Sequence, residues 1–327
     1  RPRWPLPEDG DITEVPWRQA SPPERPLTAP SMPVDPGFLS VDPLVADLLA
    51  RCDFPPAGTA VTCALSGGPD SSALAALAVA AGLIVNAVHV DHGLRARSSD
   101  DADAARSIAV GLGISCRVVR VELSDGPNLE ARARSARRAA IGPAALTGHT
   151  ADDQAETVLL ALFRGSGATG LAGIRHGPTK PIIRLRRTDT HGLCKQLGLP
   201  IVHDESNDNP RFRRNRVRQE LLPLADEIFD RDVSVLIERA ANLLRDDDVL
   251  LEELAGTIDP TDAAAITAAP LPLARRALRR WLTDDGYPPS AAALERVLSV
   301  ARGEAVACDL AGGRRVHRSA QRLWLSH

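Results

Sequence analysis

Two short stretches of this sequence carry residues whose types and spacing suit chemistry on phosphates and amines. The first is rich in glycine and directly follows a short apolar run. Its glycines let the backbone approach a ligand closely, and free N–H groups at the start of a following helix favour a phosphate group. Its aspartate could hold Mg²⁺ against phosphate oxygens. We therefore predict a phosphate-binding loop, and a simple capped turn is the alternative. The residues of this loop are Ser66, Gly67, Gly68, Pro69, Asp70 and Ser71.

The second stretch is acidic and lies where a helix is expected to begin. Thr150 and Asp153 have the spacing of a helix capping box, and acidic side chains suit the first turn of a helix. Asp152 and Glu156 are four residues apart, so two like charges lie side by side, which costs stability. A bound cation would remove that cost. Both interpretations, helix capping and cation binding, stay open, and His149 directly precedes the capping threonine.

A third stretch is basic and contains five arginines within eight residues. Residues 175–218 hold 11 Lys/Arg and 4 Asp/Glu, a balance of +7, although the whole chain has a net charge of −3. Such a segment is either a solvated face or a set of contacts to nucleic-acid phosphates, and the arginine density favours phosphates. The candidate residues are Arg211, Arg213, Arg214, Asn215, Arg216 and Arg218.

These stretches lie within a pattern of alternating strands and helices. We expect strands over residues 60–65, 84–90, 115–122 and 144–148, and helices over 71–81, 98–112, 128–140 and 151–163. This alternation is typical of a parallel sheet, so the fold class is α/β. His89 and Asp91 close the second strand, where ligands of such sheets dock. A polar strand end is the alternative for them.

The pattern changes towards both ends of the chain. Strand signals fade after residue 215, and helices are expected over 215–232, 233–256 and 271–284. Residues 1–40 are rich in proline and poor in apolar side chains, which predicts a disordered tail. The predicted units are therefore a tail (1–40), an α/β domain (41–215) and a smaller, mostly helical domain (216–327).

Composition excludes several classes of protein. The five cysteines are scattered without a CxxC pair, which argues against a disulfide framework and against a zinc or iron–sulfur site. No apolar run reaches the roughly 18 residues of a membrane span, and residues 1–11 do not resemble a signal peptide. A cytoplasmic protein is the expectation.

The glycine-rich loop resembles the SGGxDS signature of the PP-loop ATP pyrophosphatases. Four further stretches, in the same order along the chain, are similar to tRNA(Ile)-lysidine synthases. They are His89–Arg95 (HVDHGLR), Gly148–Thr157 (GHTADDQAET), Arg164–Leu171 (RGSGATGL) and residues 204–218, which begin with DESN and end with RFRRNRVR. The similarity is firm over residues 58–218 and looser over 219–327.

The resemblance implies a reaction and a set of roles. Members use ATP and Mg²⁺ to adenylate the C2 oxygen of cytidine 34 in tRNA(Ile) with a CAU anticodon, and the ε-amine of L-lysine then displaces AMP to give lysidine. The sheet would be a doubly wound parallel one of the adenine-nucleotide α-hydrolase type. ATP would contact residues 66–71, His89 and Asp91, with Asp70 as metal ligand. The implied catalytic residues are Asp70, His149, Asp152, Asp153, Glu156 and Arg137.

The sequence departs from the family pattern at two points, and two alternative functions stay open. Arg138 stands where the family usually has a tyrosine, and the chain lacks the long C-terminal extension of some members. A tRNA thiolase of the PP-loop type would use the same ATP step but would need a cysteine pair or cluster. A non-enzymatic RNA-binding protein would explain the basic segment but not the intact loop. The sequence leaves the oligomeric state open, with a homodimer among the permitted states.

Overall fold

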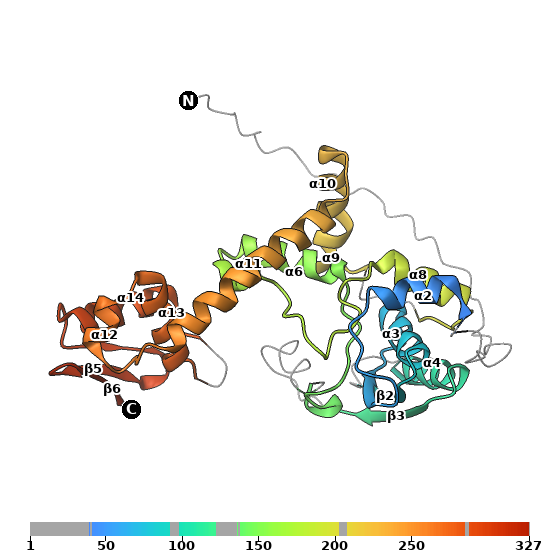
Figure 1. Ribbon diagram of the computed structural model, residues 1–327, viewed down its shortest axis with the longest axis horizontal. Helices are drawn as coiled ribbons and strands as arrows, with labels where there is room; N and C mark the ends of the chain where they lie inside the picture. Colours follow the sequence, from blue (N-terminus) through green and yellow to red (C-terminus); the bar gives the residue numbers. More distant parts are fainter. Residues whose placement is uncertain are drawn as a thin grey trace, which may run out of the picture.

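The computed structural model describes residues 39, 41–91, 98–121, 136, 138–202, 208–284 and 288–326 of the chain. In the first part of the chain, strands and helices alternate as predicted. The strand β1 pairs in parallel with β2, and β2 pairs in parallel with β3. Figure 1 shows α3 and α4 together on one face of this sheet. The elements are α2 (Pro43–Ala50), β1 (Ala60–Ala64), α3 (Pro69–Ala80), β2 (Ile84–Asp91), α4 (Ser98–Gly111), β3 (Ser115–Arg120) and α6 (Ala151–Phe163).

The strand β1 has a second parallel neighbour on its other edge. The strand predicted over residues 144–148 is reduced to one bridged residue. Leu146 forms a parallel bridge with Cys63, and the Ala64 N–H donates to the Leu146 carbonyl at 2.9 Å. The chain therefore crosses from β3 back over β1, so the order of the strands reverses at β1. In open α/β sheets, ligands bind beyond the carboxyl ends of the strands at such a reversal. The predicted doubly wound parallel sheet is confirmed, and its reversal lies between the glycine-rich loop and the acidic stretch.

The helix α3 holds the loop in place because it is buried on all sides. Residues 73–78 of this helix are apolar and at most 1% exposed, which is expected of a helix without a polar face. They join the core of the sheet domain together with Leu48 of α2 and Leu193 of α8 (Arg187–Gln196). The loop at the N-terminus of α3 is therefore anchored on a rigid element.

Leu39 is also part of this core and is only 2% exposed. The predicted disordered tail otherwise lies outside the described residues and stays a prediction. We expect deletion of residues 1–38 to leave kcat and Tm unchanged, because few apolar side chains are lost. Deletion of residues 1–40 is the matched comparison, and it should lower Tm because Leu39 is removed from the core. Equal Tm values for both truncated proteins would contradict this boundary.

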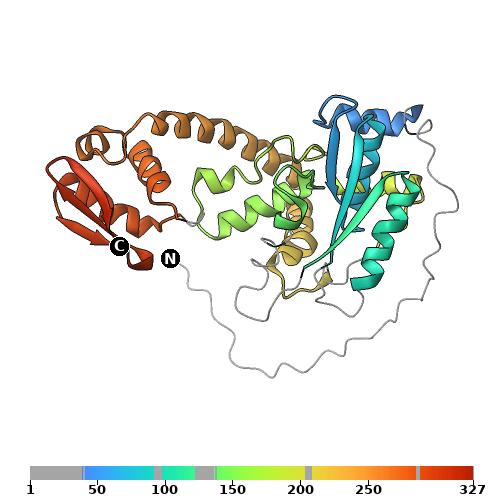
Figure 2. The ribbon, with the colours of Figure 1, turned by 90° about the horizontal axis from the view of Figure 1, so that it is seen from below.

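The second part of the chain is mostly helical, as predicted. The long helix α11 runs from the sheet domain to a separate C-terminal lobe (Figures 1 and 2). That lobe has its own core, in which Ile266, Leu278 and Val297 are fully or almost fully buried. The helices are α7 (Ala168–Leu171), α9 (Arg213–Arg216), α10 (Leu222–Phe229), α11 (Val233–Gly256), α12 (Ala263–Ala268), α13 (Leu271–Leu282) and α14 (Ala291–Arg302).

Two expectations about elements were wrong. The single helix over 215–232 is divided into α9, a π-helical turn (Val217–Leu221) and α10. Pro223 lacks the N–H that an uninterrupted α-helix needs, so the regular pattern breaks one turn before it. A three-stranded antiparallel sheet near the C-terminus was not predicted from the sequence. The predicted helix over 128–140 lies largely outside the described residues. The missed strands are β4 (Ala307–Asp309), β5 (Arg315–Ser319) and β6 (Arg322–Ser326).

None of the helices in the described part of the chain combines the length and the apolar character that crossing a bilayer requires.

Candidate functional site

The glycine-rich loop has the conformation expected of a phosphate-binding turn. Gly67 has φ +89°, a value that favours glycine. Gly68 is the N-cap of α3 and contributes no side-chain cap, so the amides of the first turn are not covered by their own cap residue. The Ser71 hydroxyl donates to the Gly68 carbonyl at 2.9 Å and lies 3.1 Å from the Ser66 nitrogen, which stabilises the turn.

The glycine-rich loop and the acidic stretch lie in direct contact. A Cβ atom at Gly148 would come within 2.7 Å of the Asp70 carbonyl oxygen and 2.9 Å of the Ser71 nitrogen. A side chain at this position would collide with backbone, so only glycine allows the two segments to approach. The fold therefore brings together two stretches that are about eighty residues apart in sequence, because each follows one of two neighbouring strand segments at the same edge of the sheet.

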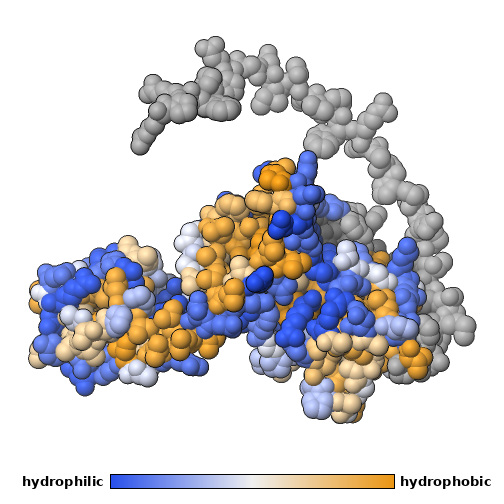
Figure 3. Space-filling view, turned by 45° about the horizontal axis from the view of Figure 1, so that its top comes forward, coloured by the Kyte–Doolittle hydropathy of each residue, from blue (hydrophilic) through white to orange (hydrophobic). Residues whose placement is uncertain are grey.

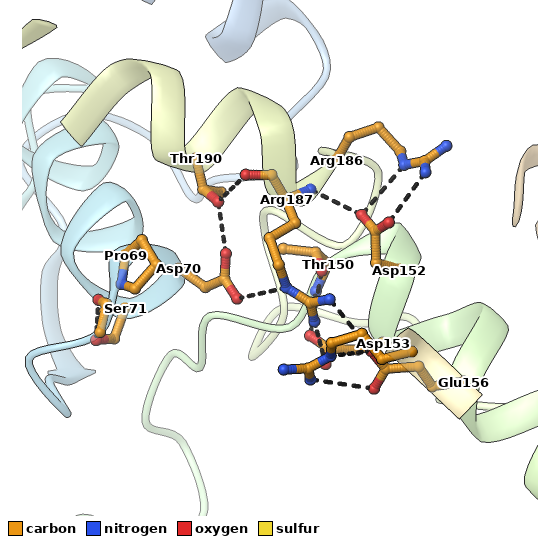
Figure 4. A network of polar contacts seen from close by, with 12 residues as sticks. Pro69, Asp70, Ser71, Thr150, Asp152, Asp153, Glu156, Arg186, Arg187 and Thr190 are labelled. Carbon is orange, nitrogen blue, oxygen red and sulfur yellow. Dashed lines mark hydrogen bonds and ion pairs between the residues drawn. The ribbon is translucent and has the colours of Figure 1, made fainter. Parts of the chain in front are cut away.

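Asp70 lies at the centre of the contact between the two stretches (Figure 4). The Thr190 hydroxyl donates to its Oδ1 at 2.5 Å, and the Arg187 Nε lies 3.6 Å from its Oδ2. Burial raises the pKa of Asp70, and the Thr190 hydroxyl and the Arg187 guanidinium only partly offset that effect. The carboxylate is thus desolvated and held in one orientation, as a ligand for a metal–phosphate group should be.

Arg187 links the loop to the acids of α6, a role that was not predicted from the sequence. Besides contacting Asp70, its guanidinium lies 3.2 Å from Asp153 Oδ1 and 3.2 Å from Glu156 Oε1. Arg187 is the first residue of α8, where the helix dipole disfavours a cation. An arginine in that position needs acidic partners. A cation at the start of a helix was therefore the sequence feature that could have indicated the role of Arg187.

Asp152 is also paired with arginine. Arg186 donates to both of its carboxylate oxygens at 2.9 and 3.1 Å, and the Arg187 N–H donates at 2.7 Å. Arg186 also contacts Asp232, just before α11. Burial by itself would raise the pKa of Asp152, but the hydrogen bonds from Arg186 and Arg187 outweigh it and hold the pKa below its ordinary value.

Glu156 is fully buried and contacts three guanidinium groups. Arg214 Nε lies 2.6 Å from Oε2, Arg218 Nε lies 2.7 Å from Oε1, and Arg187 completes the set. A bound cation was one of the two interpretations left open by the sequence, because it would relieve the repulsion between Asp152 and Glu156. In the structure arginines already relieve it, because each carboxylate has its own guanidinium partners.

Asp153 combines helix capping with ion pairing. Its carboxylate accepts from the Thr150 N–H at 2.9 Å, which is the backbone half of the predicted capping box. It also contacts Arg187 and Arg214. Burial alone would raise the pKa of Asp153, but these two guanidinium groups and the Thr150 N–H together lower it.

The lowered pKa values make the stability of this cluster dependent on pH. The ionised carboxylates are favoured in the folded protein, so their contribution is present above the unfolded-state pKa of about 3.9 and is lost as the pH falls through the lower folded-state value. We therefore expect Asp152→Asn to destabilise the protein most at neutral pH, with the difference from wild type shrinking below about pH 4. Urea unfolding of both proteins between pH 7 and pH 3 measures this. A difference that stays constant over that range would contradict it.

The two histidines differ in surroundings. His149 is half-buried, and its Nδ1 lies 2.9 Å from the Thr147 hydroxyl, which fixes the ring beside the acids of α6. His89 is buried, and its Nδ1 lies 2.9 Å from the Leu65 carbonyl oxygen. Asp91 ends β2, and its carbonyl accepts from the Val121 N–H at 2.8 Å. His89 therefore touches the strand end that leads into the loop.

The basic cluster divides into two sets. Arg214 and Arg218 point towards Glu156, whereas Arg213 is exposed and Arg216 is exposed in an ion pair with Glu220. Arg211 is also exposed, and the Asn215 amide donates to the Asn209 carbonyl. Only the exposed set is placed to meet phosphates without giving up a buried partner. Arg137, the remaining predicted site residue, lies outside the described residues.

The described residues offer one carboxylate for a phosphate-bound metal ion and several thiols of raised pKa. No group of three or more His, Cys, Asp or Glu side chains within the described ranges could hold a metal ion by itself. Mg²⁺ commonly takes one or two carboxylates together with substrate phosphates, so the single carboxylate of Asp70 beside the loop fits a phosphate-bound ion. Burial raises the pKa of Cys52, Cys63 and Cys194 to about 12, so these thiols are poor nucleophiles.

Comparison with protein families gives two matches. The family described as PP-loop domain matches residues 45–225, and the family described as TilS substrate binding domain matches residues 262–324. These ranges correspond to the sheet domain with its basic cluster and to the C-terminal lobe.

Individual relatives agree with these matches. The chain is 44% identical over 249 residues to the tRNA(Ile)-lysidine synthase of Nocardia farcinica, covering 71% of this chain and 78% of the relative. It is 37% identical over 271 residues to that of Rhodococcus jostii, covering 78% and 82%. Among solved structures, the U34-tRNA thiolase NcsA from Methanococcus maripaludis matches with a TM-score of 0.51 at 18% identity, over 62% of this chain and 78% of that one. At that identity the last match supports the fold alone.

Proposed function

The chain belongs to the tRNA(Ile)-lysidine synthase family, and we propose that the contact between its glycine-rich loop and its acidic helix is where the family's reaction occurs. The enzyme is a ligase that forms lysidine on tRNA(Ile) and uses ATP. In the finer steps, the C2 oxygen of the wobble cytidine attacks the α-phosphorus of ATP and pyrophosphate leaves. The ε-amine of L-lysine then attacks C2 and AMP leaves.

One observation carries this assignment of the site. Gly148 allows backbone contact between the loop and the start of α6, and Arg187 joins Asp70 to Asp153 and Glu156. A group bound at the loop and an amine bound at the acids would therefore be neighbours. The first half-reaction takes place at the C2 oxygen of the cytidine and the second at C2 itself, so both need this proximity.

We assign the binding of ATP phosphates to the loop residues. The amides at the N-terminus of α3 would hold phosphate oxygens, and Asp70 would hold Mg²⁺ with them. When bound, the ion would neutralise negative charge on the departing pyrophosphate. His89 and Asp91 end the neighbouring strand β2, so we assign them to the ATP side of the site.

Lysine binding requires an exchange of partners. The four carboxylates of Asp70, Asp152, Asp153 and Glu156 are matched by guanidinium groups of Arg186, Arg187, Arg214 and Arg218. We propose that the lysine ammonium replaces one of these guanidinium groups at Asp153 or Glu156, because the charge of the cluster is then unchanged. Arg214 and Arg218 are the candidates for release, since tRNA phosphates could receive them.

The amine must lose a proton before it attacks, because its reference pKa is about 10.4. Lowered pKa values make Asp152 and Asp153 weak bases. We therefore assign proton acceptance to His149, whose ring is oriented by the Thr147 hydroxyl. The acids would then bind and orient the amine.

The thiolase alternative is not favoured. Its sulfur chemistry would need reactive thiols, whereas burial raises the pKa of Cys52, Cys63 and Cys194 to about 12. A protein that only binds RNA would not need the loop and the acids to meet. The family assignment agrees with both arguments.

Incorporation of radiolabelled lysine into tRNA tests the proposal. Transcripts of tRNA(Ile) with a CAU anticodon should accept lysine with release of one AMP and one pyrophosphate, and a matched transcript with uridine 34 should not. Pyrophosphate release without lysine incorporation would favour the thiolase. Binding of the transcript without either product would favour the RNA-binding protein.

The exposed arginines provide a prediction about tRNA binding. Replacing Arg213 and Arg216 with alanine should weaken tRNA binding and make its salt dependence shallower, because fewer counterions are released. ATP binding should be unchanged. Arg106→Ala, which removes an exposed arginine from α4, is the control. An unchanged salt slope in the double variant would mean that these side chains do not touch tRNA phosphates.

A further inference from the structure

The short helix α7 belongs to the stretch Arg164–Leu171, which resembles the family but has no part in the chemistry described above. The segment after α7 is held by Gln154 of α6. The Ile174 N–H donates to the Gln154 side chain at 2.6 Å, and that side chain donates to the Ala172 carbonyl at 3.2 Å. Gln154 is fully buried and lies two residues before Glu156. The position of α7 is therefore fixed relative to the helix that carries the acids.

On its other side, α7 contacts the C-terminal half of α11. The Thr169 hydroxyl donates to Asp248 Oδ1 at 2.7 Å. Asp248 is buried, and it lies four residues before Glu252 on the same face of α11. Two carboxylates at this spacing repel each other. This part of α11 therefore needs a cation from a neighbouring element.

Arg276 of the C-terminal lobe supplies that cation. Its Nη1 lies 2.7 Å from Asp248 Oδ1 and 2.6 Å from Glu252 Oε1, and it donates to the Thr169 hydroxyl at 3.3 Å. Arg276 belongs to α13, and its side chain is only 13% exposed. One guanidinium thus joins α7 of the sheet domain to α11 and to α13 of the lobe. We call Thr169, Asp248, Glu252 and Arg276 the α7–α13 brace.

The brace lies where two separately folded units meet. The sheet domain and the lobe each have a core of their own, and residues 257–262 connect α11 to the first helix of the lobe. Charge-assisted hydrogen bonds depend on direction as well as distance, so the contacts of Arg276 restrict rotation of the lobe about this connection. The brace therefore sets the orientation of the lobe relative to α6 and its acids.

The lobe has the charge of a surface that meets nucleic acid. Residues 262–324, which match the TilS substrate binding domain, hold 10 arginines and 6 Asp/Glu, a balance of +4 in a chain with a net charge of −3. Arg279 and Arg280 are exposed on α13, one turn beyond Arg276. In Figure 3, hydrophilic residues lie over the lobe at the left and over the sheet domain at the right. A tRNA that contacts both units needs them in one fixed arrangement.

We propose that the α7–α13 brace positions tRNA, by holding the lobe in the orientation in which one tRNA contacts it while the wobble cytidine lies at the acids of α6. This inference rests on the proposed function, since tRNA is the substrate that meets both units. When the brace is broken, the lobe also occupies other orientations. The apparent dissociation constant for tRNA then rises in inverse proportion to the fraction of molecules that keep the competent orientation.

Asp248→Asn tests the brace, because simple electrostatics predicts the opposite result. The substitution removes a negative charge, which by itself would tighten the binding of tRNA phosphates. Loss of the brace should instead raise the dissociation constant of a tRNA(Ile) transcript with a CAU anticodon by about tenfold, the effect of leaving about one molecule in ten in the competent orientation. Asp247→Asn makes the same change at the exposed neighbouring residue and should bind at least as tightly as wild type. Unchanged or tighter binding by Asp248→Asn would overturn the proposal.

Variants in the other two elements should have the same effect. Thr169→Val in α7 and Arg276→Met in α13 should each weaken tRNA binding, whereas Arg276→Lys, which keeps a cation, should bind more tightly than Arg276→Met. The kcat of lysine incorporation at saturating tRNA should be retained, because the groups at the site are unchanged. Each unit has its own core, so the variants should unfold well above the assay temperature. A fall in kcat with unchanged tRNA binding would overturn the brace.

Small-angle X-ray scattering without tRNA measures the orientation of the lobe directly. We expect wild type to match the arrangement in Figures 1 and 2, and Arg276→Met to give a broader distribution of interatomic distances. Identical scattering profiles would overturn the proposal. Lysine incorporation by wild type is a separate outcome: its absence would contradict the proposed function, and tRNA binding and scattering would still decide whether the brace acts as proposed.

Discussion

Asp70→Asn is expected to reduce pyrophosphate release by more than about 100-fold, on the scale of losing one preorganised electrostatic contact in an active site. The variant keeps the shape of the side chain and its hydrogen bond with Thr190, but it removes the charge that would hold Mg²⁺ beside the phosphates. Lysine incorporation should fall in parallel, because the adenylated cytidine would no longer form. Pyrophosphate release with saturating tRNA is the measurement.

The fold of this variant should be intact. Burial raises the pKa of Asp70, so its ionised form is less favourable in the folded protein than in the unfolded chain. The contribution of the Asp70 carboxyl to the free energy of unfolding therefore decreases as the pH rises towards the raised pKa. A neutral asparagine avoids the cost of ionising this buried group. Arg187 keeps Asp153 and Glu156 as partners. We therefore expect a Tm at neutral pH no lower than that of wild type.

Asp103→Asn provides the control for Asp70→Asn. Asp103 lies on α4, is exposed and pairs with Arg106, so the same chemical change there should leave pyrophosphate release unchanged. Near-normal release by Asp70→Asn would remove Asp70 from the metal site. Loss of activity together with a collapse of Tm would instead assign it a structural role.

Glu156→Gln is expected to destabilise the folded protein by about 3–5 kcal/mol, the scale of breaking a buried ion pair on one side. The substitution leaves the partly buried guanidinium groups of Arg214, Arg218 and Arg187 with too little negative charge around them. A fall in Tm of roughly 10 °C follows for a domain of this size. If Glu156 were only a helix-capping residue, the loss would be about 1 kcal/mol or less.

Glu220→Gln is the matched control for Glu156→Gln. Glu220 also pairs with an arginine, Arg216, but both side chains are exposed, so solvent screens the pair and little stability should be lost. Thermal unfolding with a bound ATP analogue measures the stability of the variant. Its catalysis can then be assayed separately, at a temperature well below its Tm. If the folded variant retains the wild-type KM for lysine, Glu156 does not bind the amine. An unchanged Tm would contradict the role of Glu156 as partner of three arginines.

The local parts of this protein could be predicted from the sequence. The loop at residues 66–71 and its following helix, the strand–helix alternation and the bounds of α6 and α11 depend on neighbours within a few residues. Turn chemistry, capping and hydrophobic periodicity act over that range. The order of the motifs also identified the family.

The partners of the acidic side chains depended on tertiary structure. Arg187 lies 31 residues from Glu156 in sequence, Arg218 lies 62 residues from it, and Thr190 lies 120 residues from Asp70. No local rule relates such residues, because the contacts exist only after α8 and the segment around α9 pack against α3 and α6. Leu236, Leu243 and Leu250 recur every seven residues on α11 and are exposed, because the rest of the chain covers the other side of this helix. Sequence patterns therefore determined the elements and their chemistry, and packing determined which charges are neutralised and which apolar side chains stay exposed.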